Sequence, residues 1–235
     1  MLCAAECRKL PRQNFGELKI AGDWYSKAAE IAKPNRKLRA SAASCYREAK
    51  LYIAVREQLK LLFEDDKLSE ADIALAYKEM FLLLKETGDG VTAFCFGEAA
   101  LQFLPNDADF RFSLAYAYGE ATGGYWEHDY RDLSLFHYRI LPPGTPVVRN
   151  NLGVCYNSFD AVIHAADQFI AASKTGYPLV TASVVRQYLR SGFTEDAQRW
   201  ADQHQSPSDG QGDIVQALGG CIHPGLVSKK RYPAC

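Results

Sequence analysis

The residues that could do chemistry are scattered along the chain and form no known catalytic pattern. The 235-residue sequence contains no HExxH, no Gly-x4-Gly-Lys-Ser/Thr, no GxSxG, and no GxGxxG after a strand. No serine or cysteine nucleophile stands at a telling spacing from the five histidines, which are His128, His137, His164, His204 and His223. A triad assembles in space rather than in sequence, so spacing alone does not exclude one. We interpret each histidine as an ordinary surface or interface residue, and we expect neither catalysis nor a cofactor.

The cysteines suggest a metal site only near the end of the chain. Cys221 and His223, with Cys235 nearby, supply three potential zinc ligands, and the fourth of a tetrahedral site is not evident. We therefore predict no bound metal. The seven cysteines are odd in number and dispersed, at positions 3, 7, 45, 95, 155, 221 and 235. This distribution favours small buried thiols in a reducing compartment, so we predict a cytoplasmic location.

Charge and hydropathy narrow the range of partners. Lys plus Arg is 27 and Asp plus Glu is 28, so the net charge is −1 and no global basic surface attracts nucleic acid or anionic lipid. No apolar run approaches the roughly 20 residues that cross a bilayer. The first 14 residues are too polar for a secretory signal. We expect no nucleic-acid or membrane partner.

Helical periodicity dominates the chain, and strand-like alternation is nearly absent. Helix breakers divide it at Pro34, at residues 88–90 and at Pro105, and Ser69 is a good cap for the helix that follows it. The predicted helices cover 15–33, 36–49, 52–65, 69–87, 91–104, 108–121, 130–140, two helices within 149–169, 179–191 and 194–204. We predict one helical repeat domain over 1–204. Residues 205–235 are predicted to form a linker, a short capping turn and a tail.

One stretch, RNNLGVCYNSFDAVIHAADQF at 149–169, shows how the helices pair. Leu152 and Gly153 are followed by Tyr156, and nine residues later Ala165 begins an Ala-x3-Phe pattern. Small residues let two helix backbones approach where they cross, and the aromatic side chain fills the adjacent gap. The pattern recurs in part as Leu114-Ala115-x2-Tyr118, Val184-Val185-x2-Tyr188 and Ala93-x3-Gly97, whereas Phe81 and Val185 stand where a small residue is usual.

This spacing resembles the tetratricopeptide repeat (TPR), in which short helix pairs recur about every 34 residues. Prolines at 105, 142 and 178 follow that period, and the resemblance is closer over 70–204 than over 15–66. It implies an all-α fold, a right-handed α-solenoid of antiparallel helix pairs whose first helices line a concave groove. The alternative is an irregular helical bundle in which the spacing is a coincidence.

The resemblance also implies where a peptide would bind. In the family the residue before the Leu-Gly pair is often an asparagine that hydrogen-bonds the peptide backbone, and here it is Asn151. Matching positions on the other first helices, and positions three residues after them, would face the same groove. With Arg190, which lies one turn after Arg186, the predicted groove residues are Glu79, Ser113, Tyr116, Asn151, Arg186 and Arg190. The alternatives are a hydrogen bond from Asn151 to a neighbouring helix, and solvated helix faces for Glu79 and the two arginines.

A second contact surface is predicted in the long connection near residue 125. Tyr125 and Trp126 follow two glycines, and they either anchor a partner or fold back over neighbouring helices. Together these features predict a scaffold that binds a protein or peptide segment in its groove. The alternatives are self-association through the terminal hairpins, as a structural module of a larger assembly, and, less favoured, an enzyme with its site in the groove.

Overall fold

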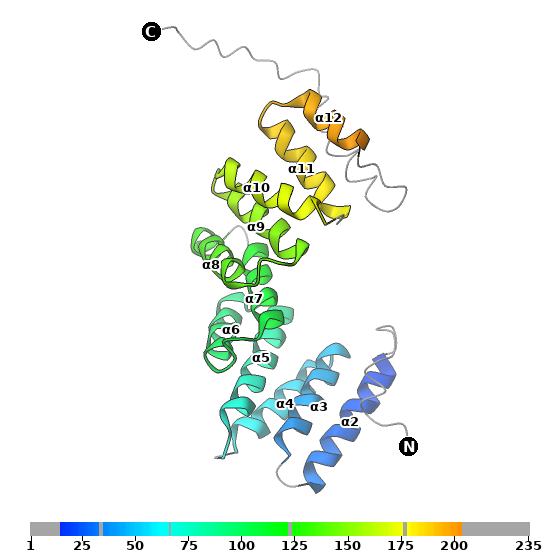
Figure 1. Ribbon diagram of the computed structural model, residues 1–235. Coiled ribbons are helices and arrows are strands. Elements are labelled where there is room, and N and C mark those ends of the chain that lie inside the picture. Colours follow the sequence, from blue (N-terminus) through cyan, green and yellow to red (C-terminus); the bar gives the residue numbers. More distant parts are fainter. Residues whose placement is uncertain (1–14, 33–34, 66, 122–123, 176–177, 204–235) are drawn as a thin grey trace. The chain divides into compact units, whose positions relative to one another are not determined.

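The computed structural model describes residues 15–32, 35–65, 67–121, 124–175 and 178–203. Within these ranges the chain forms eleven α-helices and no strand (Figure 1). The helices are α2 Phe15–Ile31, α3 Arg36–Glu48, α4 Tyr52–Phe63, α5 Glu70–Thr87, α6 Gly90–Phe103, α7 Ala108–Glu120, α8 Glu127–Ile140, α9 Pro146–Ser158, α10 Val162–Ser173, α11 Pro178–Arg190 and α12 Thr194–Gln203. The predicted tail at 205–235 and the cysteines near both ends of the sequence lie outside the described residues.

Local sequence explains most helix ends. Ser69 and Asp72 form a capping box at the start of α5, and Gly88 ends that helix with a left-handed φ of 90°. Pro146 occupies the first turn of α9, where the missing N–H of proline costs no hydrogen bond. The prediction for α8 was wrong at its start, because the helix begins at Glu127 rather than at residue 130. An ion pair between Glu127 and Arg131 stabilises this additional turn.

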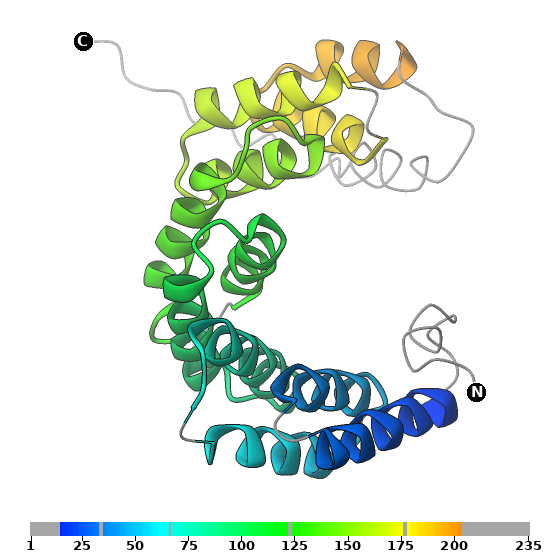
Figure 2. The same cartoon turned by 60° about the horizontal axis from the view of Figure 1, so that its bottom comes forward.

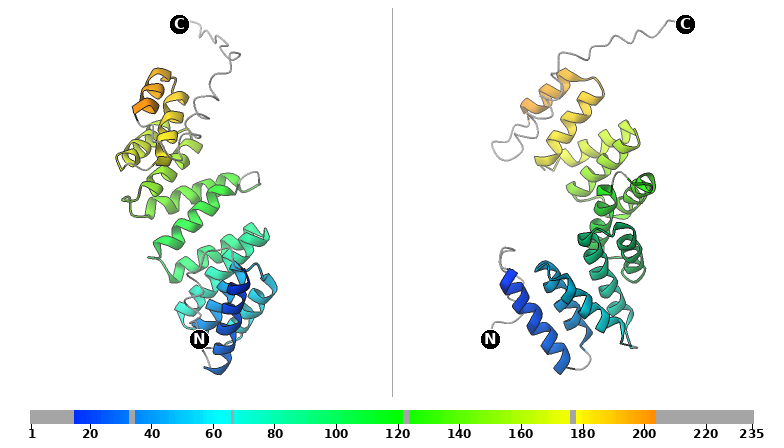
Figure 3. Two further views of the ribbon diagram at one scale, coloured as in Figure 1. Left: turned by 90° about the vertical axis from the view of Figure 1, so that its right-hand side faces the viewer. Right: turned by 180° about the vertical axis from the view of Figure 1, so that it is seen from behind.

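The helices group into two compact units, and the division falls inside α7, between Leu114 and Ala115. In unit 1, α2 packs on α3, α3 on α4, and α5 on α6, while α5 also touches α3 and α4. The blue-to-cyan helices α2, α3 and α4 lie side by side in Figure 3. A buried cluster unites α3, α4 and α5, and its members are Ala42, Ala43, Tyr46, Val55, Leu59 and Leu83.

In unit 2, successive helices pack along the sequence. α8 lies against α9, α9 against α10, α10 against α11 and α11 against α12, and α11 also reaches α9 (Figure 2). Phe169 of α10 and Val184 of α11 belong to one buried cluster, and Val185 of α11 shares another with Ala201 of α12. Each helix therefore buries its apolar face against its neighbours in sequence, as repeat proteins do.

Glycine permits close contact at two helix crossings. A Cβ atom on Gly153 of α9 would lie 2.4 Å from Cε1 of Phe169 in α10. In the α5–α6 pair the order is reversed: the first helix carries Phe81 and the second carries Gly97. A Cβ on Gly97 would lie 3.1 Å from Cδ2 of Phe81. Phe81, which departs from the small residue usual in the family, is therefore accommodated by a glycine on the facing helix.

Among the described helices, none has both the length and the apolar composition that crossing a bilayer requires.

Candidate functional site

Unit 2 contains a small cavity where α7, α8 and α9 meet. Its volume is about 90 Å³, and its lining residues are Tyr116, Gly119, Glu120, Ser134, Tyr138, Asn151, Val154 and Cys155. Two of the predicted groove residues, Tyr116 and Asn151, therefore come together although they are far apart in sequence. Val154 lies one turn after Asn151 on the same face of α9.

A chain of hydrogen bonds orients Asn151. Its Nδ2 donates to the hydroxyl of Tyr138 in α8 at 2.8 Å, and its Oδ1 accepts from Asn150 Nδ2 at 3.4 Å. Oδ1 of Asn150 in turn accepts from the hydroxyl of Ser183 in α11 at 2.9 Å. The hydrogen bond to a neighbouring helix, which the sequence left as an alternative for Asn151, is thus present. An amide has two N–H donors and two acceptor lone pairs, so Asn151 keeps capacity for a ligand.

The buried polar groups that line the cavity, those of Ser134, Tyr138 and Cys155, are uncharged. Burial raises the pKa of the Tyr138 hydroxyl, and the hydrogen bond with Asn151 lowers it only in part. Burial likewise raises the pKa of the Cys155 thiol, and its contact with Ser134 Oγ at 3.5 Å offsets part of that rise. A neutral buried thiol is a poor nucleophile. These groups are therefore suited to binding through neutral hydrogen bonds and apolar contact.

The rim of the cavity is exposed and mixed in character. Tyr116 is 47% exposed and Val154 is 54% exposed, and Glu120 is also exposed. Arg186 lies one turn after Ser183 on α11, is exposed, and has no hydrogen bond or ion pair within the described part of the chain. The rim therefore offers an aromatic side chain, an aliphatic side chain and the carboxylate of Glu120 to a ligand.

The other predicted groove residues have internal partners. Glu79 accepts from Arg47 Nε at 3.1 Å, and both side chains are only 13% exposed. Ser113 donates to the carbonyl of Asp109 one turn earlier in its own helix, at 2.9 Å. Both residues lie in unit 1.

Arg190 connects α11 to the turn between α9 and α10. It donates to the Asn157 carbonyl at 3.3 Å and pairs with Asp160, whose backbone has a φ of 55°. The pairing gives Arg190 a structural role in holding this turn.

Of the two aromatic residues before α8, Tyr125 is largely exposed and Trp126 is half-buried. Tyr125 is 89% exposed and Trp126 is 49% exposed, and their rings meet edge to face with centroids 5.0 Å apart. They form an exposed aromatic pair at the start of α8.

Sequence reasoning missed several matches because the pattern is degenerate. Ala42-Ala43-x2-Tyr46 in α3, followed nine residues after Tyr46 by Val55, repeats the crossing pattern in the N-terminal part, and all four residues are buried. Ser134 and Tyr138 were missed for a different reason. The long connection before α8 displaces them from the usual spacing. A search from Ala115 that allows an insertion would find Ser134. The Ser134 hydroxyl donates to the Ala115 carbonyl at 2.8 Å.

The described histidines and cysteines form no metal site. Within the ranges that the structure describes, no group of three or more His, Cys, Asp or Glu side chains is placed to hold a metal ion. His137 is 1% exposed and stacks on Tyr118 with ring centroids 5.8 Å apart, so it is an interface residue between α7 and α8. Cys45 and Cys155 are buried thiols outside any disulfide, as predicted, whereas Cys95 is exposed, contrary to the prediction.

The chain has a TPR-like, all-helical α-solenoid fold, as predicted. The features that define this class of fold are the paired helices and the crossings at which a small residue meets an aromatic one. Among solved structures, it is similar to the C-terminal part of a TPR repeat-containing protein from Cytophaga hutchinsonii, with 15% identity, a TM-score of 0.62, and coverage of 92% of this chain and 80% of that one.

Two further solved structures are similar to this chain. BtubC from P. vanneervenii has 17% identity and a TM-score of 0.61, with 95% of this chain and 96% of that one covered. A mutant form of MamA has 16% identity and a TM-score of 0.55, with 78% and 97% covered. No family model and no curated protein sequence matches the chain. At these identities the similarity shows the fold alone, because one fold hosts many functions.

Proposed function

We propose that this protein is a non-enzymatic, cytoplasmic scaffold that binds an extended protein segment on the first-helix face of unit 2. The binding surface comprises the α7–α8–α9 cavity and its exposed rim, with Arg186 of α11 beside it. The observation that carries the proposal is the convergence of Tyr116, Asn151 and Val154 on one cavity. Residues from different helices that meet at one cavity beside exposed apolar groups are typical of a recognition site.

Each part of the surface has a defined role in this proposal. Asn151 is oriented by Tyr138 and Asn150, so its remaining donor and acceptor meet the backbone of an extended segment at little entropic cost. Tyr116 and Val154 supply apolar contact area. Arg186 is placed to pair with a carboxylate of the partner.

A pull-down from cell extract with a matched pair of variants tests the proposal. Val154→Arg places a long charged side chain at the rim, while Val91→Arg makes the same change at a valine of similar exposure in unit 1, 57% against 54%. We expect wild type and Val91→Arg to retain the same partner and Val154→Arg to lose it. All three proteins should have the same circular dichroism spectrum and melting temperature, because both valines are exposed.

The result against the proposal is equally clear. A partner that Val154→Arg retains as well as Val91→Arg does would exclude the α7–α8–α9 surface as its binding site. If Val154→Arg loses the partner instead, the unchanged fold of both variants excludes misfolding as the cause of that loss.

A second candidate function, self-association through a terminal hairpin, rests on α2. Ile20, Trp24 and Ile31 of this helix are 52%, 50% and 85% exposed, and their spacing places them along one face. Sedimentation velocity over a wide range of concentration tests this candidate. A mass that rises with concentration, and that falls back to the monomer value in Trp24→Glu, would support it, whereas a constant monomer mass would contradict it.

A further inference from the structure

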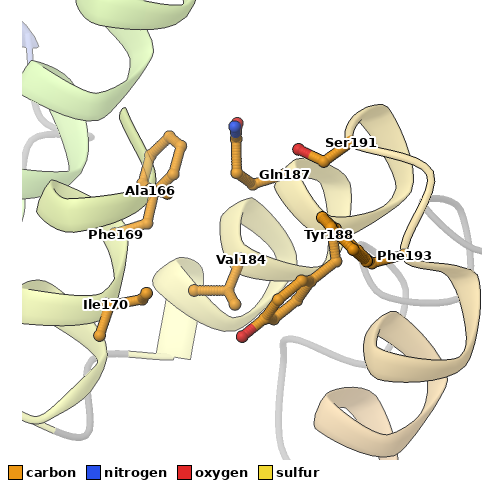
Figure 4. A pocket seen from close by; sticks show the side chains of 8 residues that line it. All are labelled: Ala166, Phe169, Ile170, Val184, Gln187, Tyr188, Ser191 and Phe193. Carbon is orange, nitrogen blue, oxygen red and sulfur yellow. The ribbon is translucent and has the colours of Figure 1, made fainter. Parts of the chain in front are cut away.

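A cavity between α10 and α11 and the exposed face of α2 are both apolar, and both lie outside the proposed binding surface. The cavity has a volume of about 120 Å³, and Phe169 and Ile170 of α10 lie opposite Val184 of α11 there (Figure 4). No charged side chain of the described residues lines it, so its lining does not distinguish one apolar occupant from another. On α2, in contrast, charged residues flank the apolar ones, and their order along the helix favours one occupant.

The exposed face of α2 carries a stripe of residues at coiled-coil spacing. The residues that α2 buries are Leu18, Ala21, Gly22 and Ala29. On the outer side of the helix, four residues follow one another at spacings of three, four and three, and these are Glu17, Ile20, Trp24 and Lys27. Ile20 and Trp24 are 52% and 50% exposed, so the middle of the stripe is apolar surface that faces solvent.

The two ends of the stripe carry opposite charges that are not in ion pairs. Neither Glu17 nor Lys27 forms an ion pair with another described side chain, and the Lys27 ammonium lies 5.8 Å from the centroid of the Trp24 ring. Beside the stripe, Lys19 and Asp23 pair with each other at 2.7 Å. The charges next to the stripe are therefore neutralised within the helix, whereas those at its ends are open to a partner.

The stripe is complementary to itself. From its N-terminal end it is negative, apolar, apolar and positive. An antiparallel copy of α2, with the two-fold axis at the level of Gly22, places Glu17 against Lys27 of the copy and Ile20 against Trp24 of the copy. Two-fold symmetry makes each contact twice. A parallel copy would instead place each charge opposite the same charge, which is unfavourable.

The alternative antiparallel register satisfies the stripe less well. A shift of seven residues keeps the coiled-coil spacing and places Ile20 against Ile31 of the copy. Glu17 would then lie beyond the end of the partner α2, without a cation opposite it, and a shorter part of Phe15–Ile31 would be paired. The register at Gly22 pairs both charges and more of the helix.

We propose that α2 pairs in antiparallel orientation with α2 of a second copy of this chain. Ile20 and Trp24 meet in the middle of the interface, and Glu17 and Lys27 form an ion pair at each end. This inference rests on the second candidate function, self-association through α2, to which it adds the orientation and the register. The interface involves one helix of each chain and exposed ion pairs, so its affinity should decrease as the salt concentration rises.

Charge reversal tests the orientation, with sedimentation velocity of the full chain at low salt as the measurement. Glu17→Lys and Lys27→Glu each change both end contacts from attraction to repulsion, so each should weaken the dimer by about tenfold. The double variant exchanges the two charges and should restore the wild-type affinity. Glu57→Lys is the control, because it makes the same charge change at an exposed residue of α4 and should leave the affinity unchanged.

Carbodiimide crosslinking tests the register. The reagent joins a carboxylate directly to an amine as an amide, so the two side chains must be in contact. Glu17 and Lys27 are about 15 Å apart along one helix, because each residue of an α-helix adds about 1.5 Å. A crosslink between them therefore forms only between two chains. We expect a covalent dimer in which mass spectrometry finds the Glu17 peptide joined to the Lys27 peptide.

Different results would overturn different parts of the inference. A constant monomer mass would overturn it together with the second candidate function. A dimer whose affinity is unchanged in both single variants, or is not restored in the double variant, would overturn the antiparallel orientation and leave self-association in place. A Glu17 crosslink to another lysine would overturn the register. None of these results bears on the pull-down with Val154→Arg, so failure of this interface and failure of the proposed binding surface remain distinguishable.

Discussion

At the scale of single residues, two close helix crossings in this protein pair a glycine with a phenylalanine. In the α9–α10 pair the glycine is Gly153 on the first helix and the ring belongs to Phe169 on the second, while α5 and α6 carry Phe81 and Gly97 in the reverse order. The combined volume of the two facing side chains is the same at both crossings, although the glycine and the phenylalanine have changed helices. Packing constrains the sum of two side chains, so either order satisfies it.

Gly153→Ala is expected to destabilise the protein by about 1–3 kcal/mol, because the added methyl would overlap the Phe169 ring. The change is measured as the shift in free energy of unfolding by urea. Gly90→Ala is the matched control, since a Cβ there meets nothing within 4 Å. The control should be neutral or slightly stabilising, because alanine favours helix over glycine.

Phe169→Leu should partly relieve the overlap in the double variant. We expect Gly153→Ala with Phe169→Leu to be less destabilised than the sum of the two single variants, as a double-mutant cycle measures. Strict additivity would show that the glycine acts through backbone freedom alone and not through contact with the ring.

The same pairs show what sequence reasoning reached at this scale. The Leu152-Gly153 and Ala165-x3-Phe169 spacing predicted the α9–α10 crossing, and the structure confirms it. Phe81 was correctly noted as unusual, but its compensation by Gly97 depends on contact between two helices and could not be read from one position. The hydrogen bond from Asn151 to Tyr138 depends in the same way on a partner 13 residues away in another helix.

At the scale of elements, the caps and interhelical ion pairs hold successive helices in place. Ser69→Ala removes one half of the capping box of α5 and should cost about 0.5–2 kcal/mol of stability. Ser173→Ala is the control, because that hydroxyl donates to the Ile170 carbonyl within its own helix. Equal costs for both variants in urea unfolding would contradict a special role for the cap.

Glu86 of α5 makes stability depend on pH. It accepts from Arg47 Nη1 at 2.8 Å, from Lys50 Nζ at 2.7 Å and from the Tyr52 hydroxyl at 3.2 Å, so it joins α3 and the start of α4 to α5. Burial raises its pKa, but the hydrogen bonds from Lys50 and Arg47 outweigh that effect, and the net pKa is lowered. A carboxyl group whose folded pKa is lowered stabilises the protein above its unfolded pKa, and this stabilisation is lost as the pH falls.

Glu86→Gln should therefore cost about 1.5–3 kcal/mol at neutral pH, the typical value for hydrogen bonds to a charged group. The difference from wild type should shrink as the pH falls below about 4, where an ordinary glutamate becomes protonated. Urea unfolding at a series of pH values measures it. Glu64→Gln is the control, since Glu64 is 56% exposed and lies 3.7 Å from Lys60. A difference that does not change with pH would contradict the assigned role.

Sequence reasoning succeeded best at the scale of elements. Every predicted helix within the described residues is present, because helical periodicity, Ser69 and the glycine and proline breakers are local signals. The start of α8 was misplaced because the Glu127–Arg131 pair extends that helix into what the sequence presents as a loop. The cavity lined by Phe169, Val184 and Gln187 was not predicted, because it arises only where α10 and α11 pack together.

At the scale of the whole molecule, the TPR-like fold is shown and the binding surface is proposed. Structural similarity at 15–17% identity reaches the fold and stops there. The proposed function therefore rests on residues of this chain, above all on Tyr116, Asn151 and Val154, which converge on one cavity. Recognition by a surface of this kind requires that a partner touch its rim directly.

Site-specific photocrosslinking tests that requirement most directly. A benzophenone amino acid at position 154, and the same residue at the equally exposed position 91 as the control, would be irradiated in cell extract. The account predicts a discrete crosslinked product from position 154 that position 91 does not give and that an excess of unlabelled wild-type protein competes away. The same product from both positions, or no competed product from position 154, would contradict it.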